Sequence, residues 1–142
     1  MKAYADTSFL VSLYSPDGNS AAAVETMRSA KGERYLTVWG ELEMVNALEL
    51  RVFRKELSAP QAAASMKGFA EDLASGIFQL RPLSDRVFER AHQLSRQTTA
   101  RLGTRTADLV HVAAALELDA DYLYSFDRQQ RKLAQAVRLK LN

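Results

Sequence analysis

Cysteine is absent from the 142 residues, and proline and glycine are sparse, with 3 and 6 residues. Without cysteine the chain can form neither a disulfide framework nor a thiolate zinc site, which fits a reducing compartment, so we expect a cytoplasmic protein. No stretch approaches the roughly 20 apolar residues that a membrane span needs. The first residues reach an acid, Asp6, before a signal-like apolar core can form. We therefore expect neither a targeting segment nor membrane attachment.

The few glycines and prolines lie where helices and strands should end, and the chain shows no internal repeat, low-complexity tract or linker. A chain of this length buries roughly two thirds of its unfolded surface, which is enough for a hydrophobic core. Hydrophobic residues make up 47% and charged residues 25% of the chain, and both fractions are ordinary for a globular protein. We predict a single domain over residues 1–142.

The net charge is only +2, but it is unevenly distributed. Residues 1–50 hold 4 Lys and Arg against 7 Asp and Glu, residues 51–100 hold 8 against 5, and residues 101–142 hold 7 against 5. Many of the basic residues are arginine, whose guanidinium suits bidentate contact with phosphate. A solvated basic face explains any single arginine equally well. The charge is therefore compatible with nucleic acid without indicating it.

Short apolar runs alternate with helical patterns along the chain. The predicted strands cover residues 2–5, 35–38, 77–80, 121–126 and, at an edge, 137–141. The predicted helices cover residues 9–14, 19–30, 39–54, 58–75, 84–99, 106–117 and 128–136. This alternation indicates an α/β fold with a parallel sheet and right-handed crossovers.

Two of the predicted helices have informative apolar patterns. In the helix over residues 39–54, a stripe of Leu42, Val45, Leu48 and Val52 should face the core. The helix that Thr104 or Thr106 caps is apolar nearly all round, so it should be central and buried.

Four acidic residues fall where a parallel sheet would gather them at one edge. Asp6 and Asp127 each follow a predicted strand, whereas Glu43 and Asp108 lie near the start of long helices. In open parallel sheets, ligands bind beyond the carboxyl ends of the strands. The helix that carries Asp108 must descend to the opposite edge, so its first turn also starts at this edge.

Crowded carboxylates repel one another, so a fold that gathers them needs a cation to hold them. Hard oxygen ligands favour Mg²⁺ or Mn²⁺. Such a metal would polarise a phosphoryl group and lower the pKa of a bound water, which becomes the nucleophile, so that no histidine base is required. A divalent-metal site is therefore the leading hypothesis.

The chain contains, in this order, the segments Ala5–Val11, Glu43–Leu48, Arg105–Ala115 and Ser125–Gln130. Together they resemble the signature segments of PIN-domain ribonucleases, and look most like those of the VapC-type toxins of bacterial toxin–antitoxin pairs. The resemblance implies a three-layer α/β/α sandwich with a mostly parallel sheet of about five strands. It also implies Mg²⁺- or Mn²⁺-dependent cleavage of RNA. The implied partners are a small antitoxin protein and a second copy of the chain in a homodimer.

Carried over residue by residue, the resemblance makes Asp6 and Asp108 the main metal ligands. It makes Glu43 and Asp127 the other two catalytic acids, which hold metal or water. The resemblance also implies supporting hydroxyls: Thr7 or Ser8 would orient Asp6, and Ser125 stands where the family more often has threonine.

Each acid also has a purely structural interpretation. Asp6 and Asp127 could cap the helices that follow them, Asp108 could favour the positive end of its helix dipole, and Glu43 could be solvated. His111, one turn after Asp108, is either part of an acid–histidine pair or a satisfied histidine on a buried helix.

Two competing functions remain open. A catalytically inactive PIN-like module could bind RNA or a partner's arginines through the same acidic edge. Phosphoryl transfer through an aspartate is the other alternative, although Asp6 is followed by Thr7 and Ser8 and not by a second aspartate two residues on.

Overall fold

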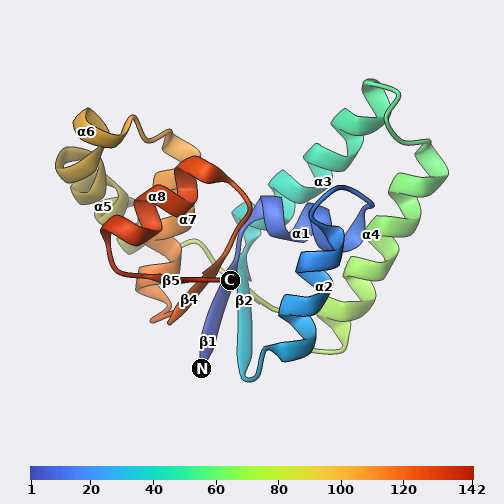
Figure 1. Cartoon of the computed structure of the whole chain (residues 1–142), viewed down its shortest axis with the longest axis horizontal. Coiled ribbons are helices and arrows are strands. Elements are labelled where there is room, and N and C mark those ends of the chain that lie inside the picture. The colour runs from blue at the N-terminus through green and yellow to red at the C-terminus, as the bar shows by residue number, and fades with distance from the viewer.

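The computed structural model describes all residues 1–142 (Figure 1), and it contains one five-stranded sheet in the order β3-β2-β1-β4-β5. Every neighbouring pair of strands is parallel. The strands are β1 (Lys2–Ala5), β2 (Glu33–Thr37), β3 (Gln79–Arg81), β4 (Tyr122–Tyr124) and β5 (Lys140–Leu141). The predicted parallel α/β fold is confirmed.

The helices surround this sheet on both faces. They are α1 (Thr7–Tyr14), α2 (Ser20–Ser29), α3 (Val38–Phe53), α4 (Ala59–Ala74), α5 (Asp85–Leu94), the π-helical turn η1 (Ser95–Thr99), α6 (Ala100–Leu102), α7 (Thr106–Glu117) and α8 (Arg128–Ala136). The predicted helix over residues 84–99 therefore consists of two consecutive pieces, α5 and η1, and α6 continues it to Leu102. Neither Thr104 nor Thr106 caps α7, because Arg105 takes the N-cap position. No helix is both long enough and apolar enough to cross a membrane.

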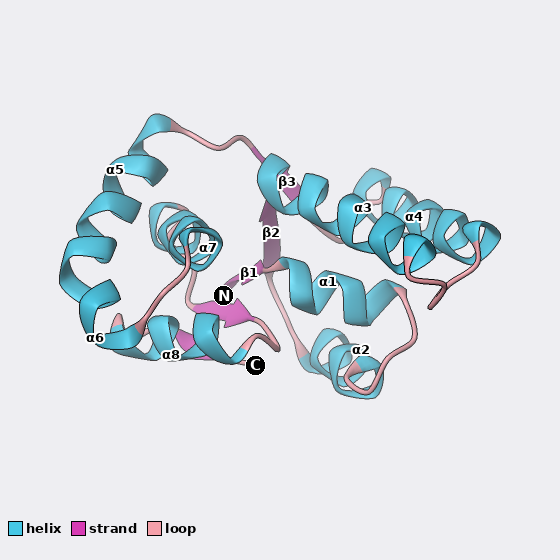
Figure 2. Cartoon of the chain, turned by 90° about the horizontal axis from the view of Figure 1, so that it is seen from above, coloured by secondary structure: helices cyan, strands magenta, loops and turns pink.

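The sheet separates two hydrophobic cores, and the view from above shows helices on both of its faces (Figure 2). Helices α1 to α4 cover one face, and α5 to α8 cover the other. Alternate residues of β1 divide between them: Tyr4 packs into the core under α5, α7 and α8, whereas Ala3 and Ala5 pack under α1 to α4. This is the alternation expected of a strand that is buried on both sides.

The chain reverses its direction of travel through the sheet next to β1. From β1 it moves outward to β2 and β3, and it then crosses back to β4 and β5 on the other side. In open α/β sheets the ligand crevice lies at such a switch point, outside the carboxyl ends of the strands. Here that point lies between the carboxyl ends of β1 and β4, where the Asp6 backbone N–H donates to the Tyr124 carbonyl.

The buried face of α3 agrees with the predicted stripe at Leu48 but differs from it at Leu42 and Val45. Leu42 is 65% exposed and Val45 is 37% exposed, whereas Met44 and Leu48 are fully buried. The helix has apolar residues on several faces, so their spacing did not define one direction. Gly40 starts the buried stripe, and it lies against α7: a Cβ there would be in ordinary van der Waals contact with His111 Cε1, at 3.7 Å.

This rotation of α3 gives a stability test. Leu48→Ala should lower the free energy of unfolding by about 2–5 kcal/mol, because it leaves a cavity in the core. Leu42→Ala, on the exposed face of the same helix, should change it by less than about 0.5 kcal/mol. Urea unfolding followed by circular dichroism measures both, and equal losses would contradict this orientation of α3.

Candidate functional site

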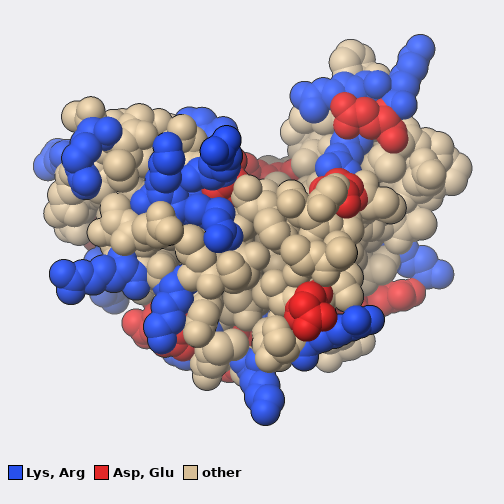
Figure 3. Space-filling view, viewed as in Figure 1, with Lys and Arg blue, Asp and Glu red and all other residues tan.

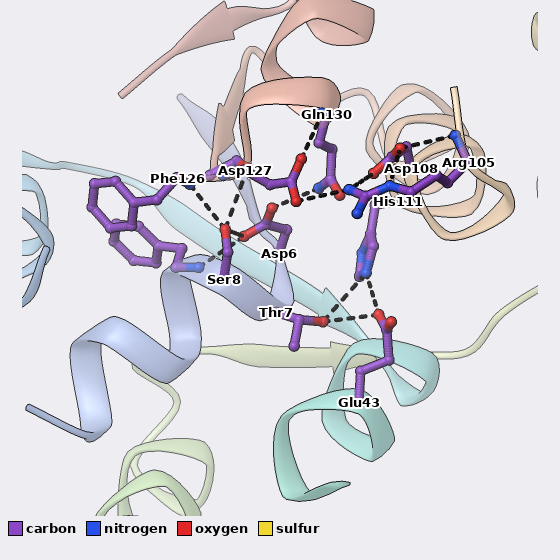
Figure 4. Close-up of polar contacts among 12 residues, drawn as sticks. Asp6, Thr7, Ser8, Glu43, Arg105, Asp108, His111, Phe126, Asp127 and Gln130 are labelled. Carbon is purple, nitrogen blue, oxygen red and sulfur yellow. Dashed lines mark hydrogen bonds and ion pairs between the residues drawn. The ribbon is translucent and has the colours of Figure 1, made fainter. Parts of the chain in front are cut away.

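A cleft of about 560 Å³ opens at the carboxyl ends of β1, β2 and β4. All four acids of the sequence analysis line it: Asp6, Glu43, Asp108 and Asp127. They come from four separate segments, and Figure 4 shows three aspartates on one side of the cleft and Glu43 on the other.

Asp6 lies at the floor of the cleft and is only 1% exposed. It follows β1 and caps α1, so its Oδ1 accepts hydrogen bonds from the Phe9 backbone N–H at 2.8 Å and from the Ser8 hydroxyl at 2.7 Å. Its Oδ2 accepts from Gln130 Nε2 at 2.7 Å. Burial raises the pKa of Asp6 above its ordinary value in spite of these donors. A cation beside this carboxylate would offset the cost of ionising it.

Asp108 and Asp127 share one partner, Arg105. The Arg105 guanidinium donates to both oxygens of Asp108, at 3.0 and 2.9 Å, and to Asp127 Oδ2 at 2.8 Å. Asp108 is buried, whereas the Arg105 side chain is 60% exposed. Burial opposes ionisation of Asp127, but the Gln130 backbone N–H and the Arg105 guanidinium outweigh it and hold the pKa of Asp127 below its usual range.

Glu43 belongs to a different hydrogen-bond group. Its Oε1 accepts from the Thr7 hydroxyl at 2.8 Å and contacts His111 Nε2. His111 Nδ1 lies 2.9 Å from the hydroxyl of Tyr4, which lies 3.2 Å from Thr37 Oγ1. Burial raises the pKa of Glu43, but the bonds from His111 and Thr7 outweigh it, so the pKa is lowered.

The supporting hydroxyls divide between these two groups. Ser8 donates to Asp6, whereas Thr7 donates to Glu43. Ser125 is fully buried, and its hydroxyl accepts the backbone N–H two residues further on, which fixes the turn after β4.

The three aspartates take the helix-terminal roles considered for them and also line the cleft. Asp6 and Asp127 cap α1 and α8 with their side chains, and Asp108 accepts the Arg105 backbone N–H at the start of α7. Capping therefore aims each carboxylate at the cleft, because all three helices begin at this edge. Their N-termini also make the edge favourable for negative charge.

Two contacts in the cleft were not predicted from the sequence: Gln130 with Asp6, and His111 with Glu43. Gln130 is buried and lies three residues after Asp127, so it faces the sheet from the first turn of α8. The spacing of three residues between this polar side chain and the capping acid is the sequence signal that could have predicted its position. His111 pairs with Glu43 rather than with Asp108, because α3 and not its own helix lies against its ring.

The donor set suits a hard divalent cation, since it consists of carboxylate oxygens with two buried members, Asp6 and Asp108. No three acidic or histidine side chains stand close enough to surround a metal ion. Arg105 takes up the charge of Asp108 and Asp127, so it stands where positive charge is needed.

The rim of the cleft is basic. Arg51 and Arg54 line its α3 wall, and Arg105 lines the opposite wall. In Figure 3 the cleft appears as a notch at the top of the molecule, with basic side chains on both sides of it and acidic ones between them. Arg51 is held by Asp17 at 3.3 Å. A polyanion lying across the notch would meet positive charge on both walls.

Comparison with known proteins gives a consistent result. Residues 3–136 match the family model described as PIN domain. No curated protein sequence matches the chain.

Several solved structures are similar to the chain. The Mycobacterium tuberculosis VapC20 toxin, which cleaves the sarcin–ricin loop, superposes with a TM-score of 0.71 at 17% identity, covering 92% of this chain and 93% of its own. VapBC2 from Rickettsia felis, bound to a fragment of promoter DNA, has a TM-score of 0.68 at 15% identity and covers 100% and 98%. FitAcB from Neisseria gonorrhoeae has a TM-score of 0.68 at 17% identity and covers 98% and 95%.

Proposed function

The chain belongs to the PIN domain family, and from this premise we propose that it is a metal-dependent endoribonuclease, the toxin component of a toxin–antitoxin pair. The observation that supports this most is the arrival of four acids from four segments at one cleft. Two of them, Asp6 and Asp108, are buried at its floor. Burying carboxylates in a shared pocket costs free energy, which a cation-binding function explains.

Asp6 and Asp108 would hold Mg²⁺ or Mn²⁺, with Asp127 beside them and Glu43 on the opposite wall. The ion would supply electrophilic assistance to phosphodiester hydrolysis. The pKa of Glu43 is lowered, so it is ionised at neutral pH, and it lines the cleft. Its carboxylate would orient the attacking water there. Ser8 and Gln130 keep Asp6 in a fixed rotamer.

The basic walls would hold the RNA. Arg54 makes no ion pair and is exposed at the rim, so it is available to a phosphate. Arg105 would turn from the aspartates to the substrate once the positive charge of the ion replaces it. Arginine suits this exchange, because its guanidinium binds carboxylate and phosphate with the same geometry.

The proposed partners are a small antitoxin and a second copy of the chain. Support for the antitoxin comes from the similar structures, which include a toxin–antitoxin complex from Klebsiella pneumoniae with a TM-score of 0.62 at 15% identity, covering 88% of this chain and 86% of its own. The second copy is an expectation from the family resemblance. We propose a cytoplasmic location because the chain has no cysteine, which fits a reducing compartment.

The function is tested with purified protein and a fluorogenic single-stranded RNA. Cleavage should require Mg²⁺ or Mn²⁺ and should stop when EDTA is in excess, because the acids alone provide no electrophile. The same assay on total tRNA and ribosomal RNA would identify the target. Undiminished cleavage in EDTA would contradict the proposal.

One observation favours a binding module without catalysis. Arg105 already neutralises Asp108 and Asp127, so the cleft is partly balanced without an ion. Calorimetry separates the two functions: the inactive module should bind RNA but show no heat of Mn²⁺ binding, and alanine at the four acids should leave its RNA affinity unchanged.

A further inference from the structure

A chain of polar side chains runs through the core from the sheet to the cleft. Tyr4 is fully buried and His111 is 2% exposed, although both carry polar atoms. Buried polar groups are costly unless they are hydrogen-bonded, so such a pair needs partners. Hydrophobic side chains could fill both positions if packing were their only role, and the polar pair therefore indicates another use.

One assignment of donors and acceptors satisfies every hydrogen bond between these side chains. Thr37 Oγ1 accepts the Gly40 backbone N–H at 3.3 Å, so its own hydrogen is free for the Tyr4 oxygen. The fully buried Tyr4 phenol then has its own hydrogen to donate to His111 Nδ1, at 2.9 Å. The remaining ring nitrogen, Nε2, then carries the hydrogen and donates to Glu43.

The series of hydrogen-bonded side chains ends at Thr37, which also has a structural role. Thr37 ends β2 and caps α3, the helix that carries Glu43. His111 lies against Gly40 of the same helix, within 3.7 Å of the position of a Cβ. The same polar chain thus contacts both the start of α3 and the carboxylate that this helix presents to the cleft.

We propose that His111 is a positioning residue that holds the carboxylate of Glu43 in one orientation at the cleft wall. It does so through a hydrogen bond from Nε2–H, and the bond from Tyr4 to Nδ1 fixes the tautomer of the His111 ring. The inference rests on the proposed ribonuclease function. Glu43 is 29% exposed, and a free glutamate side chain samples several rotamers. Thr7 alone would restrain only one of its oxygens, the one that His111 also contacts.

Kinetics of two variants test the role. His111→Leu, which cannot donate, should lower kcat about 10-fold and leave KM within about twofold, because general positioning contributes to the reacting state and not to RNA binding. His111→Gln places an amide near the position of Nε2 and should recover most of kcat. The exposed His92→Gln on α5 is the control. Equal kcat values for wild type and His111→Leu would overturn the proposal.

Nitrogen NMR tests the hydrogen bond without catalysis. The ¹H–¹⁵N spectrum of the two histidines should show His111 as the neutral Nε2–H tautomer, with His92 as the exposed reference. Glu43→Gln should shift the Nε2 resonance, and Tyr4→Phe should shift Nδ1. A protonated Nδ1 in neutral His111, or an Nε2 insensitive to Glu43→Gln, would overturn the proposal. Wild-type protein that cleaves no RNA but shows these signatures would contradict only the proposed function.

Discussion

Asp6→Asn is expected to abolish metal-dependent RNA cleavage, with a loss of at least about 1000-fold in kcat/KM. This corresponds to about 4 kcal/mol of transition-state stabilisation, the several kcal/mol that a divalent ion supplies. Asn is isosteric and keeps an acceptor for the Ser8 and Phe9 donors, so the fold should persist. Asp108→Asn should give the same loss. Cleavage within tenfold of wild type in both variants would contradict the assignment of this site.

The free energy of unfolding of Asp6→Asn shows whether the variant has lost only the ion or also its fold. The pKa of Asp6 is raised in the folded protein, so ionising it costs stability as pH rises through that value, and Asn at this position avoids the cost. Without metal, Asp6→Asn should therefore be at least as stable as wild type near pH 7, and this advantage should vanish below the ordinary pKa of 3.8. Urea unfolding at several pH values measures it.

Added ion should reverse this order. Mn²⁺ at about 100 times its dissociation constant should stabilise the wild type by about 2.7 kcal/mol, and Asp6→Asn should show little of this gain. Asp119→Asn is a matched control, because Asp119 is exposed and away from the cleft, and Asn tolerates its positive φ of 53°.

Arg105→Met should strengthen Mn²⁺ binding about 10-fold and weaken RNA cleavage about 100-fold. Affinity should rise because the guanidinium no longer occupies Asp108 and Asp127, and a tenfold gain corresponds to about 1.4 kcal/mol. Cleavage should fall because a donor to the phosphate is lost, an effect that costs about 100-fold in comparable sites. Calorimetry with Mn²⁺ and the fluorogenic assay at saturating ion measure the two effects.

These opposite changes distinguish a counter-ion from a structural ion pair. If Arg105 only stabilises α7, both affinity and cleavage should follow the loss of stability in the same direction. Arg101→Met is the control, because Arg101 is an exposed arginine on α6 that lies outside the cleft. Tighter metal binding without any loss of cleavage would remove the RNA contact from the proposed role of Arg105.

Much of this protein follows from local patterns in its sequence. β1 and α8 have the predicted bounds, and the other strands differ by a few residues, because apolar runs and caps are local signals. The alternation of strands and helices also implied that Asp6, Glu43, Asp108 and Asp127 start from one edge, since parallel topology leaves few alternatives.

The pairing of side chains was decided only by the tertiary structure. The rotation of α3, the choice of Glu43 and not Asp108 as the partner of His111, and the contact of Gln130 with Asp6 all join residues distant in the sequence. Each depends on how one element packs against another, to within a fraction of a helical turn. Spacing along the chain gives the direction of a side chain relative to its own helix, whereas its partner is set by the neighbouring element.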